Sequence, residues 1–271
     1  DRLRNNSNFS FIYHDIADPL QISEYINFVY NFACPASPTD FEKLRIPILK
    51  ACCFGSYNLL ELAKIKRARY IFASTSEVYG NQLEHPQKED HHGNVNITGV
   101  RSVYDEGKRY GETMLSVFNR EYGVETRTVR VFNTYGEYMR PDDGRAIPTF
   151  ITQALRNEDI TIFGEGSQTR SIQYISDLVR GVLLLAESDV TLPINIGNPA
   201  EVTMIELATM IKHLSGSKSR IVRSRSLPED DPLVRRPDIS RAKHLLGWEP
   251  QVSPEDGLKR TINWFRTKIV V

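Results

Sequence analysis

A tyrosine and a lysine four residues apart could act together as an acid–base pair. Tyr104 and Lys108 lie in the segment Ser102-Val-Tyr-Asp-Glu-Gly-Lys108, which has the composition of a helix. This spacing puts both side chains on one helix face, about one turn apart. An ammonium beside a phenol favours the phenolate and lowers the pKa of the tyrosine. Such a phenol can take a proton from a hydroxyl group while a hydride leaves the same carbon.

Two motifs flank this pair and strengthen the interpretation that Tyr104 and Lys108 are catalytic residues. Alone, a tyrosine and a lysine at this spacing are weak evidence, because many helices contain them by chance. Ala73-Ser-Thr-Ser-Glu-Val-Tyr-Gly80 precedes the pair, and Arg130-Val-Phe-Asn-Thr-Tyr-Gly136 follows it. Both motifs fall at or just after the end of a predicted strand, which is where open parallel sheets bind ligands.

The composition limits the classes of function. The 271 residues include 34 basic and 34 acidic side chains, and this balance argues against a dedicated nucleic-acid binder. No apolar run approaches the ~18 residues that a membrane span needs, and no secretory signal peptide is visible. Cys34, Cys52 and Cys53 form no spaced framework and indicate reduced thiols. We therefore expect a cytoplasmic protein that binds neither nucleic acid nor membrane.

Strand-like and helix-like segments alternate along the first half of the chain. We expect strands over 9–13, 28–33, 70–73 and 125–132, and helices over 48–64 and 104–122. This alternation predicts an α/β fold with a doubly wound parallel sheet. In the second half we expect helices over 147–156, 176–187 and 203–214, short strands over 161–166 and 193–197, and a loop over 226–238.

Five motifs together resemble the extended short-chain dehydrogenase/reductases that act on nucleotide sugars. They are Thr75-Ser-Glu-Val-Tyr-Gly80, Tyr104-x-x-x-Lys108, Phe132-Asn-Thr-Tyr-Gly136, Arg170-Ser-Ile-Gln-Tyr174 and Asn195-Ile-Gly-Asn198. Within that group the chain looks most like the UDP-glucuronate decarboxylases. The longest shared strings are Ala33–Pro38, Leu83–Lys88, Gly99–Arg109 and Arg236–Ala242.

Ser76 and Glu77 help to separate the subfamilies. The related 4,6-dehydratases usually carry an aspartate where this chain has Ser76, and the 4-epimerases generally lack the glutamate. The decarboxylase is therefore the leading hypothesis. A 4,6-dehydratase, a 4-epimerase and a nucleotide-sugar-binding paralogue without turnover remain as alternatives.

The resemblance implies a role for each residue of the central motifs. Bound NAD+ would take a hydride from C4 of the sugar, with Tyr104 as the base and Lys108 holding the nicotinamide ribose. Thr75 would hydrogen bond the C4 oxygen as it becomes a ketone. Ser76 and Glu77 would order the sugar ring and relay a proton. The resulting 4-keto acid would lose CO2, and return of the hydride to C4 would regenerate the cofactor.

Further residues would bind the UDP-sugar and the cofactor. Arg235 is the candidate for pairing with the substrate carboxylate, because a guanidinium matches a carboxylate in a two-pronged contact; Arg236 is the alternative. The resemblance assigns the diphosphate and uridine contacts to Asn133, Arg145 and Arg170. Around the cofactor it assigns Asp15 and Ile16 to the adenine end, and Ala33 to the same site as Tyr104 and Lys108.

The resemblance also implies how the chain is organised. Residues 1–136 would form a NAD-binding Rossmann-like domain, rejoined by about 170–192. Residues 137–169 and 193–271 would form a smaller α+β lobe that binds the nucleotide sugar. The helices over 48–64 and 104–122 would pair across a homodimer, although intramolecular packing leaves the same apolar faces.

Two features depart from the family pattern. The family opens with a strand and Gly-x-x-Gly-x-x-Gly, whose glycines let the cofactor pyrophosphate approach a helix N-terminus. The 271 residues contain no such motif, and we expect them to begin after the family's second strand and to bind NAD poorly on their own. Cys52 stands where the family usually has an asparagine that supports the catalytic helix or a water relay. We expect this substitution to reduce or redirect activity.

Overall fold

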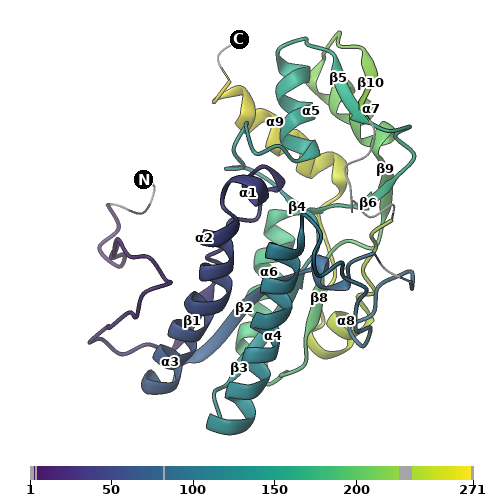
Figure 1. Ribbon diagram of the computed structural model, residues 1–271. Coiled ribbons are helices and arrows are strands. Elements are labelled where there is room, and N and C mark those ends of the chain that lie inside the picture. Colours follow the sequence, from purple (N-terminus) through teal and green to yellow (C-terminus); the bar gives the residue numbers. More distant parts are fainter. Residues whose placement is uncertain (1–2, 4, 82, 226–233, 270–271) are drawn as a thin grey trace.

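A parallel sheet forms the centre of the protein. The computed structural model describes residues 3, 5–81, 83–225 and 234–269 (Figure 1). Within these residues the sheet has four strands in the order β1-β2-β3-β8, and every neighbouring pair is parallel. The strands are β1 (Phe28–Asn31), β2 (Arg69–Thr75), β3 (Thr126–Val131) and β8 (Ile194–Ile196). The predicted doubly wound α/β fold is confirmed.

Helices cover both faces of this sheet because side chains alternate along each strand. Tyr70 and Phe72 of β2 pack in one apolar cluster, whereas Ile71 packs in another on the opposite face. The first face carries α3 (Ser56–Lys66) and α4 (Ser102–Tyr122), and the second carries α6 (Ile175–Glu187) and α8 (Ser240–Leu246). The sheet is therefore buried between two helical layers (Figure 1).

A second lobe lies beyond the carboxyl ends of the strands, at the top of Figure 1. Its apolar core joins α5 (Ala146–Leu155), α7 (Met204–Ser215) and α9 (Pro254–Arg266) to the strand β5 (Ile160–Phe163). β5 pairs in parallel with β10 (Ile221–Arg225). Two small pairs connect the lobes, β4 (Thr134–Tyr135) with β7 (Gln173–Tyr174) and β6 (Thr169–Ser171) with β9 (Glu201–Thr203).

The expected boundary of the lobe at residue 193 is wrong. Ile194–Ile196 forms β8, which hydrogen bonds to β3 and buries all three side chains in the main sheet. α8 packs on the same strand, through Ala242 and Trp248 just beyond it. Ile194 and Ile196 pack in the apolar cluster of one face, and Asn195 is buried on the other face, where its Oδ1 accepts a hydrogen bond from Tyr79 Oη at 2.7 Å. Burial on both faces is typical of a strand in a parallel sheet that helices cover on both sides, wherever the strand lies in the chain.

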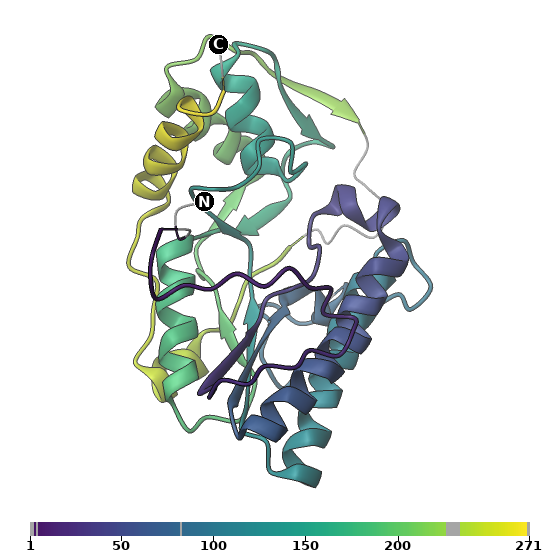
Figure 2. The same ribbon diagram turned by 90° about the vertical axis from the view of Figure 1, so that its left-hand side faces the viewer.

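Two expectations for the first strands are also corrected. Residues 9–13 do not form a strand, and Phe11 and Tyr13 are exposed. This part of the chain instead runs as extended coil past β1 and α3 (Figure 2). β1 forms where predicted but is not buried, because Phe28 and Tyr30 lie on the edge strand of the described sheet.

The helical segments before and after β2 carry the residues of the candidate active site. The predicted helix over 48–64 is divided into α2 (Arg45–Lys50), a π-helical turn η1 (Ala51–Gly55) and α3, and is preceded by α1 (Pro38–Lys43). A 3-10 turn, η2 (Ser76–Tyr79), follows β2 directly. α4 ends at Gly123 as predicted, with a left-handed C-cap at φ 66°. No helix in the described residues is long and apolar enough to cross a bilayer.

Close packing of α4 on β2 generates the first prediction. A Cβ at Gly111 would lie 2.4 Å from Phe72 Cζ, inside a closed apolar layer. We expect Gly111→Ala to lower the free energy of unfolding by about 1–3 kcal/mol through overpacking, despite the higher helix propensity of alanine. Ser116→Ala, at an exposed position of the same helix, is the matched control. Denaturant unfolding measures both, and equal stability of the two variants would contradict the packing argument.

Candidate active site

The first two turns of α4 bring Tyr104 and Lys108 to the carboxyl end of β2. Both side chains are buried, and the Tyr104 ring stacks on Phe41 with centroids 5.0 Å apart. Lys108 Nζ donates a hydrogen bond to Ala73 O at 2.8 Å and lies 5.7 Å from the Tyr104 ring centroid. The pair is thus on one helix face beside the end of a central strand, as its spacing predicts.

Burial raises the pKa of Tyr104 well above its ordinary value, so the expected lowering by Lys108 is wrong for this structure. The negative charge of a Cys34 thiolate raises the pKa further, and the charge on Glu77 acts in the same direction. A hydrogen bond with the Thr75 side chain has the opposite effect. Lys108 directs its ammonium to a main-chain carbonyl of β2, and the phenol is protonated at neutral pH.

A buried carboxylate between two guanidiniums lies next to this pair. Glu77 comes from η2, directly after β2. Arg235 forms a bidentate contact with it, and Nη1 donates to Oε1 at 2.6 Å while Nη2 donates to Oε2 at 2.7 Å. Arg101, at the start of α4, places Nη2 2.8 Å from Glu77 Oε1. Burial alone would raise the pKa of Glu77, but the two guanidiniums outweigh it and lower the pKa to about 2.

Asp105 is a buried acid that the sequence analysis did not single out. It follows Tyr104 on α4 and is 6% exposed. Burial, reinforced by the charge on Glu77, raises the pKa of Asp105 to about 7. Its Oδ1 is a buried oxygen without a hydrogen-bond partner in the described residues. The aspartate was visible in the sequence, but nothing there indicated that α4 would bury it against a second carboxylate.

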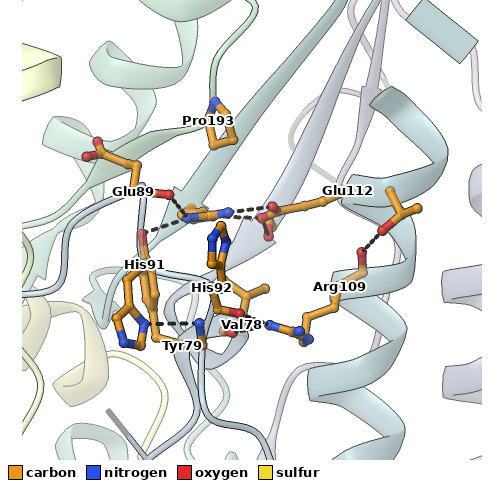
Figure 3. Close-up of polar contacts among 12 residues, drawn as sticks. Val78, Tyr79, Glu89, His91, His92, Arg109, Glu112 and Pro193 are labelled. Atoms are coloured by element: carbon orange, nitrogen blue, oxygen red, sulfur yellow. Dashed lines mark hydrogen bonds and ion pairs between the residues drawn. The ribbon is translucent and has the colours of Figure 1, made fainter. Parts of the chain in front are cut away.

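A polar network holds the loop that follows Glu77 against α4 and β3. Arg130 pairs with Glu112 through Nε at 2.9 Å and Nη2 at 2.7 Å, and its Nη1 donates to Tyr79 Oη and Glu89 O, both at 2.9 Å (Figure 3). Arg109 donates to two main-chain carbonyls of the same loop (Figure 3). These buried contacts between charged groups fix the backbone around Ser76 and Glu77. The described residues contain no cluster of metal-ligating side chains.

The residues expected to bind UDP are spread over the second lobe and its connections. Asn133 follows β3, and its carbonyl accepts from Gln173 N at 2.9 Å. Arg145 precedes α5 and forms a bidentate contact with Asp143, and this contact raises the pKa of the Arg145 guanidinium. Arg170 lies on β6, with Nη1 donating to the Thr169 carbonyl at 2.8 Å.

The residues expected around the cofactor lie before and after β1. Ala33 is the second residue after β1, and its N–H donates to Asn31 Oδ1 at 3.2 Å. Asp15 accepts from the N–H of Ala17 at 2.9 Å, so it orders its own turn. Ile16 packs on η1 and α3, where its carbonyl accepts a hydrogen bond from Asn58 Nδ2 at 3.0 Å. These residues border the α3 face, on the side of the sheet that carries α4.

Comparison with known proteins assigns this chain to a family. The model of the GDP-mannose 4,6 dehydratase family matches residues 1–261. The chain belongs to this family. It is 48% identical to UDP-glucuronic acid decarboxylase 1 of Danio rerio over 97% of this chain and 62% of the relative. It is 48% identical to UDP-glucuronic acid decarboxylase 6 of Arabidopsis thaliana over 97% of this chain and 76% of the relative.

Solved structures agree with the family assignment. UDP-glucuronic acid 4-epimerase from Bacillus cereus in complex with NAD has a TM-score of 0.84 and 29% identity, covering 98% of this chain and 84% of its own. UDP-glucose 4-epimerase from Thermotoga maritima with UDP-glucose has a TM-score of 0.83 and 30% identity, covering 89% and 78%. The chain spans about three fifths of the length of the first curated relatives that it matches.

The Glu77 pair generates a pH prediction. Folding lowers the pKa of Glu77 from 4.5 to about 2. The ion pair therefore contributes fully to the free energy of unfolding when the pH is above the pKa of the unfolded state, and this contribution is lost as the pH falls through the pKa of the folded state. We expect the wild type to exceed Glu77→Gln in stability by on the order of 3 kcal/mol at neutral pH. Most of this difference should disappear between about pH 5 and pH 2.

Denaturant unfolding at a series of pH values measures this difference. Glu84→Gln removes an exposed carboxylate from the nearby loop and controls for the change of net charge. Parallel stability curves for the wild type and Glu77→Gln across this range would contradict the ion-paired state of Glu77.

Proposed function

We propose that the chain carries the active-site residues of a UDP-glucuronate decarboxylase, which converts UDP-glucuronate to UDP-xylose and CO2 with NAD as cofactor. The observation that carries the proposal is the buried cluster of Glu77, Arg101 and Arg235 beside Tyr104. The names of relatives that are 46–48% identical support the same activity.

The charge of this cluster suits a sugar that carries a carboxylate. Glu77, Arg101 and Arg235 together carry one net positive charge, since one carboxylate faces two guanidiniums. Asp105 is only partly ionised at neutral pH, because its pKa is raised to about 7, so it offsets part of this positive charge but not all of it. A substrate carboxylate would balance the remaining positive charge, and hydrogen bonds from the N–H groups of Arg235 that do not face Glu77 would orient it. A neutral hexose would leave that charge uncompensated in a buried site.

The first step would be removal of the C4 hydroxyl proton. Tyr104 is the proposed acceptor, with Thr75 bridging the phenol and the C4 oxygen. When bound, NAD+ supplies the group that accepts the C4 hydride and later returns it. Because burial raises the pKa of Tyr104, we infer that proton transfer occurs only within the complete complex, where the hydroxyl and the phenol are hydrogen bonded.

The second step would be loss of the carboxylate. With a ketone at C4 the sugar is a β-keto acid, and the electrons of the breaking C5–carboxyl bond pass into the new carbonyl to form an enolate. Thr75 and Tyr104 would stabilise the enolate oxygen by hydrogen bonds. Arg235 and Glu77, with Ser76, would hold the ring and relay to C5 a proton that comes from solvent. Departure of CO2 would return the cluster to its net positive charge.

The donor groups at this site fit the ribose end of NAD. Lys108 has three N–H donors, and among the described residues one of them is directed to Ala73 O. Its other donors, together with the Tyr104 hydroxyl, suit the two hydroxyls of a ribose. We propose that Tyr104, Lys108 and Ala33 contact the nicotinamide half, and that Asp15 and Ile16 contact the adenine half.

We also propose that two copies of the chain associate through α3 and α4. The outer faces of these helices expose Tyr57, Tyr110, Val117 and Tyr122, which are apolar or aromatic side chains close together on two packed helices. Burying such a patch would stabilise a homodimer. A cytoplasmic location is consistent with the three free cysteines, since cytosolic proteins keep thiols reduced.

Tyr104→Phe tests the role of the proposed base. We expect this variant to keep its affinity for UDP-glucuronate and to lose turnover by about 10²- to 10⁴-fold, because the ring still packs on Phe41 while the acid–base group is gone. Calorimetric titration gives the affinity and a discontinuous assay gives the rate. Tyr25→Phe, at an exposed position, is the matched control. Turnover of Tyr104→Phe equal to that of the control would overturn the assignment.

The product separates the decarboxylase from the other reactions of this fold. Full-length protein is incubated with UDP-glucuronate and NAD+, and the sugar nucleotide is followed by proton NMR. We expect UDP-xylose, with a single deuterium at C5 when the reaction runs in D2O. UDP-galacturonate would indicate a 4-epimerase, and an unchanged spectrum with bound UDP-glucuronate would indicate a binding protein.

A further inference from the structure

Two cysteine sulfurs lie side by side next to the proposed base. Cys34, three residues after the end of β1, and Cys52, in the π-helical turn η1, have their Sγ atoms 3.3 Å apart. Cys52 is 2% exposed, whereas Cys34 is partly exposed. Cys52 is also the residue that departs from the asparagine usual in the family. The turn that carries it packs closely on α4, where a Cβ at Gly107 would lie 3.0 Å from Cys52 Sγ.

The two thiols differ in their ease of ionisation. A hydrogen bond from Cys52 lowers the pKa of Cys34 to about 7, against the effect of burial, and the positive charge of Lys108 on α4 lowers it further. The same hydrogen bond and burial raise the pKa of Cys52. The charge on Cys34 also acts on Tyr104, whose pKa is raised so that the phenol is protonated at neutral pH. Cys34 is therefore partly thiolate at neutral pH, and a thiolate is the reactive form of cysteine.

We propose that Cys34 and Cys52 are a modification site that a low-molecular-weight disulfide, such as oxidised glutathione, converts to an intramolecular disulfide. The Cys34 thiolate would attack one glutathione sulfur, breaking the glutathione S–S bond and releasing one glutathione thiolate. Cys52 would give its proton to that thiolate and attack Cys34 Sγ, expelling the second glutathione. The protein loses two electrons, and one oxidised glutathione becomes two reduced glutathiones.

The geometry suits this bond. A disulfide needs its sulfurs about 2.05 Å apart, so the present separation must shorten by only about 1.3 Å. Cys34 lies in the coil between β1 and α1, and Cys52 lies in a helical turn held against α4. We therefore expect the coil around Cys34 to move toward Cys52, and glutathione to reach Cys34 from its exposed side.

The disulfide would change the surroundings of Tyr104. A Cys34 thiolate raises the pKa of Tyr104, and a neutral disulfide removes that effect. The bond would also tie the end of β1 to the turn that supports α4, which carries both Tyr104 and Lys108. The modified protein would thus differ from the reduced protein in the part of the site proposed for the nicotinamide. The bond itself rests on the sulfur positions alone, independently of the proposed reaction.

Thiol mapping tests the proposal without any assay of turnover. Purified protein is incubated with oxidised glutathione at neutral pH, remaining thiols are alkylated, and intact mass and peptide maps are recorded under non-reducing conditions. We expect a loss of two hydrogen atoms, a linked peptide pair containing Cys34 and Cys52, and alkylation of Cys53. Burial raises the pKa of Cys53, which makes it the slower thiol.

Two variants sharpen the result. Cys53→Ser should give the same linked pair, because Cys53 takes no part. Cys52→Ser should stop at a glutathione adduct on Cys34, since the attacking thiol is gone. The peptide map of the wild-type protein shows which cysteines are linked, even if Cys52→Ser does not fold. A link that includes Cys53, a stable Cys34–glutathione adduct in the wild type, or full alkylation of all three thiols would each overturn the proposal.

Discussion

The ion pair between Glu77 and Arg235 is the contact on which the site depends. It joins the turn after β2 to a segment more than half the chain away, and Arg101 adds the start of α4 to the same carboxylate. Removing one partner would leave a buried charge without compensation, which costs several kcal/mol in typical proteins. The pair therefore fixes three segments around Tyr104, and at the same time keeps a guanidinium ready for a second carboxylate.

The resting state of the tyrosine follows from the same burial. A closed apolar wall of Phe41 and Cys52 beside the Tyr104 ring favours the neutral phenol, and Lys108 does not offset this while it is directed to Ala73 O. The protein thus holds its proposed base protonated until a ligand enters. A thiolate at Cys34 acts in the same direction, which links the ionisation of the cysteine pair to that of the tyrosine.

Periodic patterns in the sequence predicted most of the sheet and helices, because local apolar spacing decides them. α4, its glycine cap and the strands β2 and β3 lie where expected. Pairing over long distances could not be read in this way. β8 joins the main sheet, and residues 9–13 remain coil. A segment becomes a strand of a sheet only where a neighbouring strand hydrogen bonds to it, and local spacing of apolar residues does not reveal that neighbour.

The site was predictable to the extent that its residues fall in motifs. Thr75, Glu77 and Tyr104 meet where two motifs converge at the end of β2. Asp105 and the contact between Cys34 and Cys52 were not foreseen, because burial and the separation of two sulfurs are set by packing of α4 on η1. The pKa of Tyr104 was expected to fall and instead rises, because desolvation outweighs a neighbouring ammonium whose hydrogen bond goes elsewhere.

Release of labelled CO2 is the measurement that tests the central claim most directly. Full-length protein is supplied with UDP-glucuronate labelled in the carboxyl carbon and with NAD+, and NADH absorbance is followed in the same sample. The account predicts one CO2 for each substrate consumed, without accumulation of NADH, because the hydride returns to C4. Consumption of substrate without CO2, or NADH formed in equal amount to product, would contradict it.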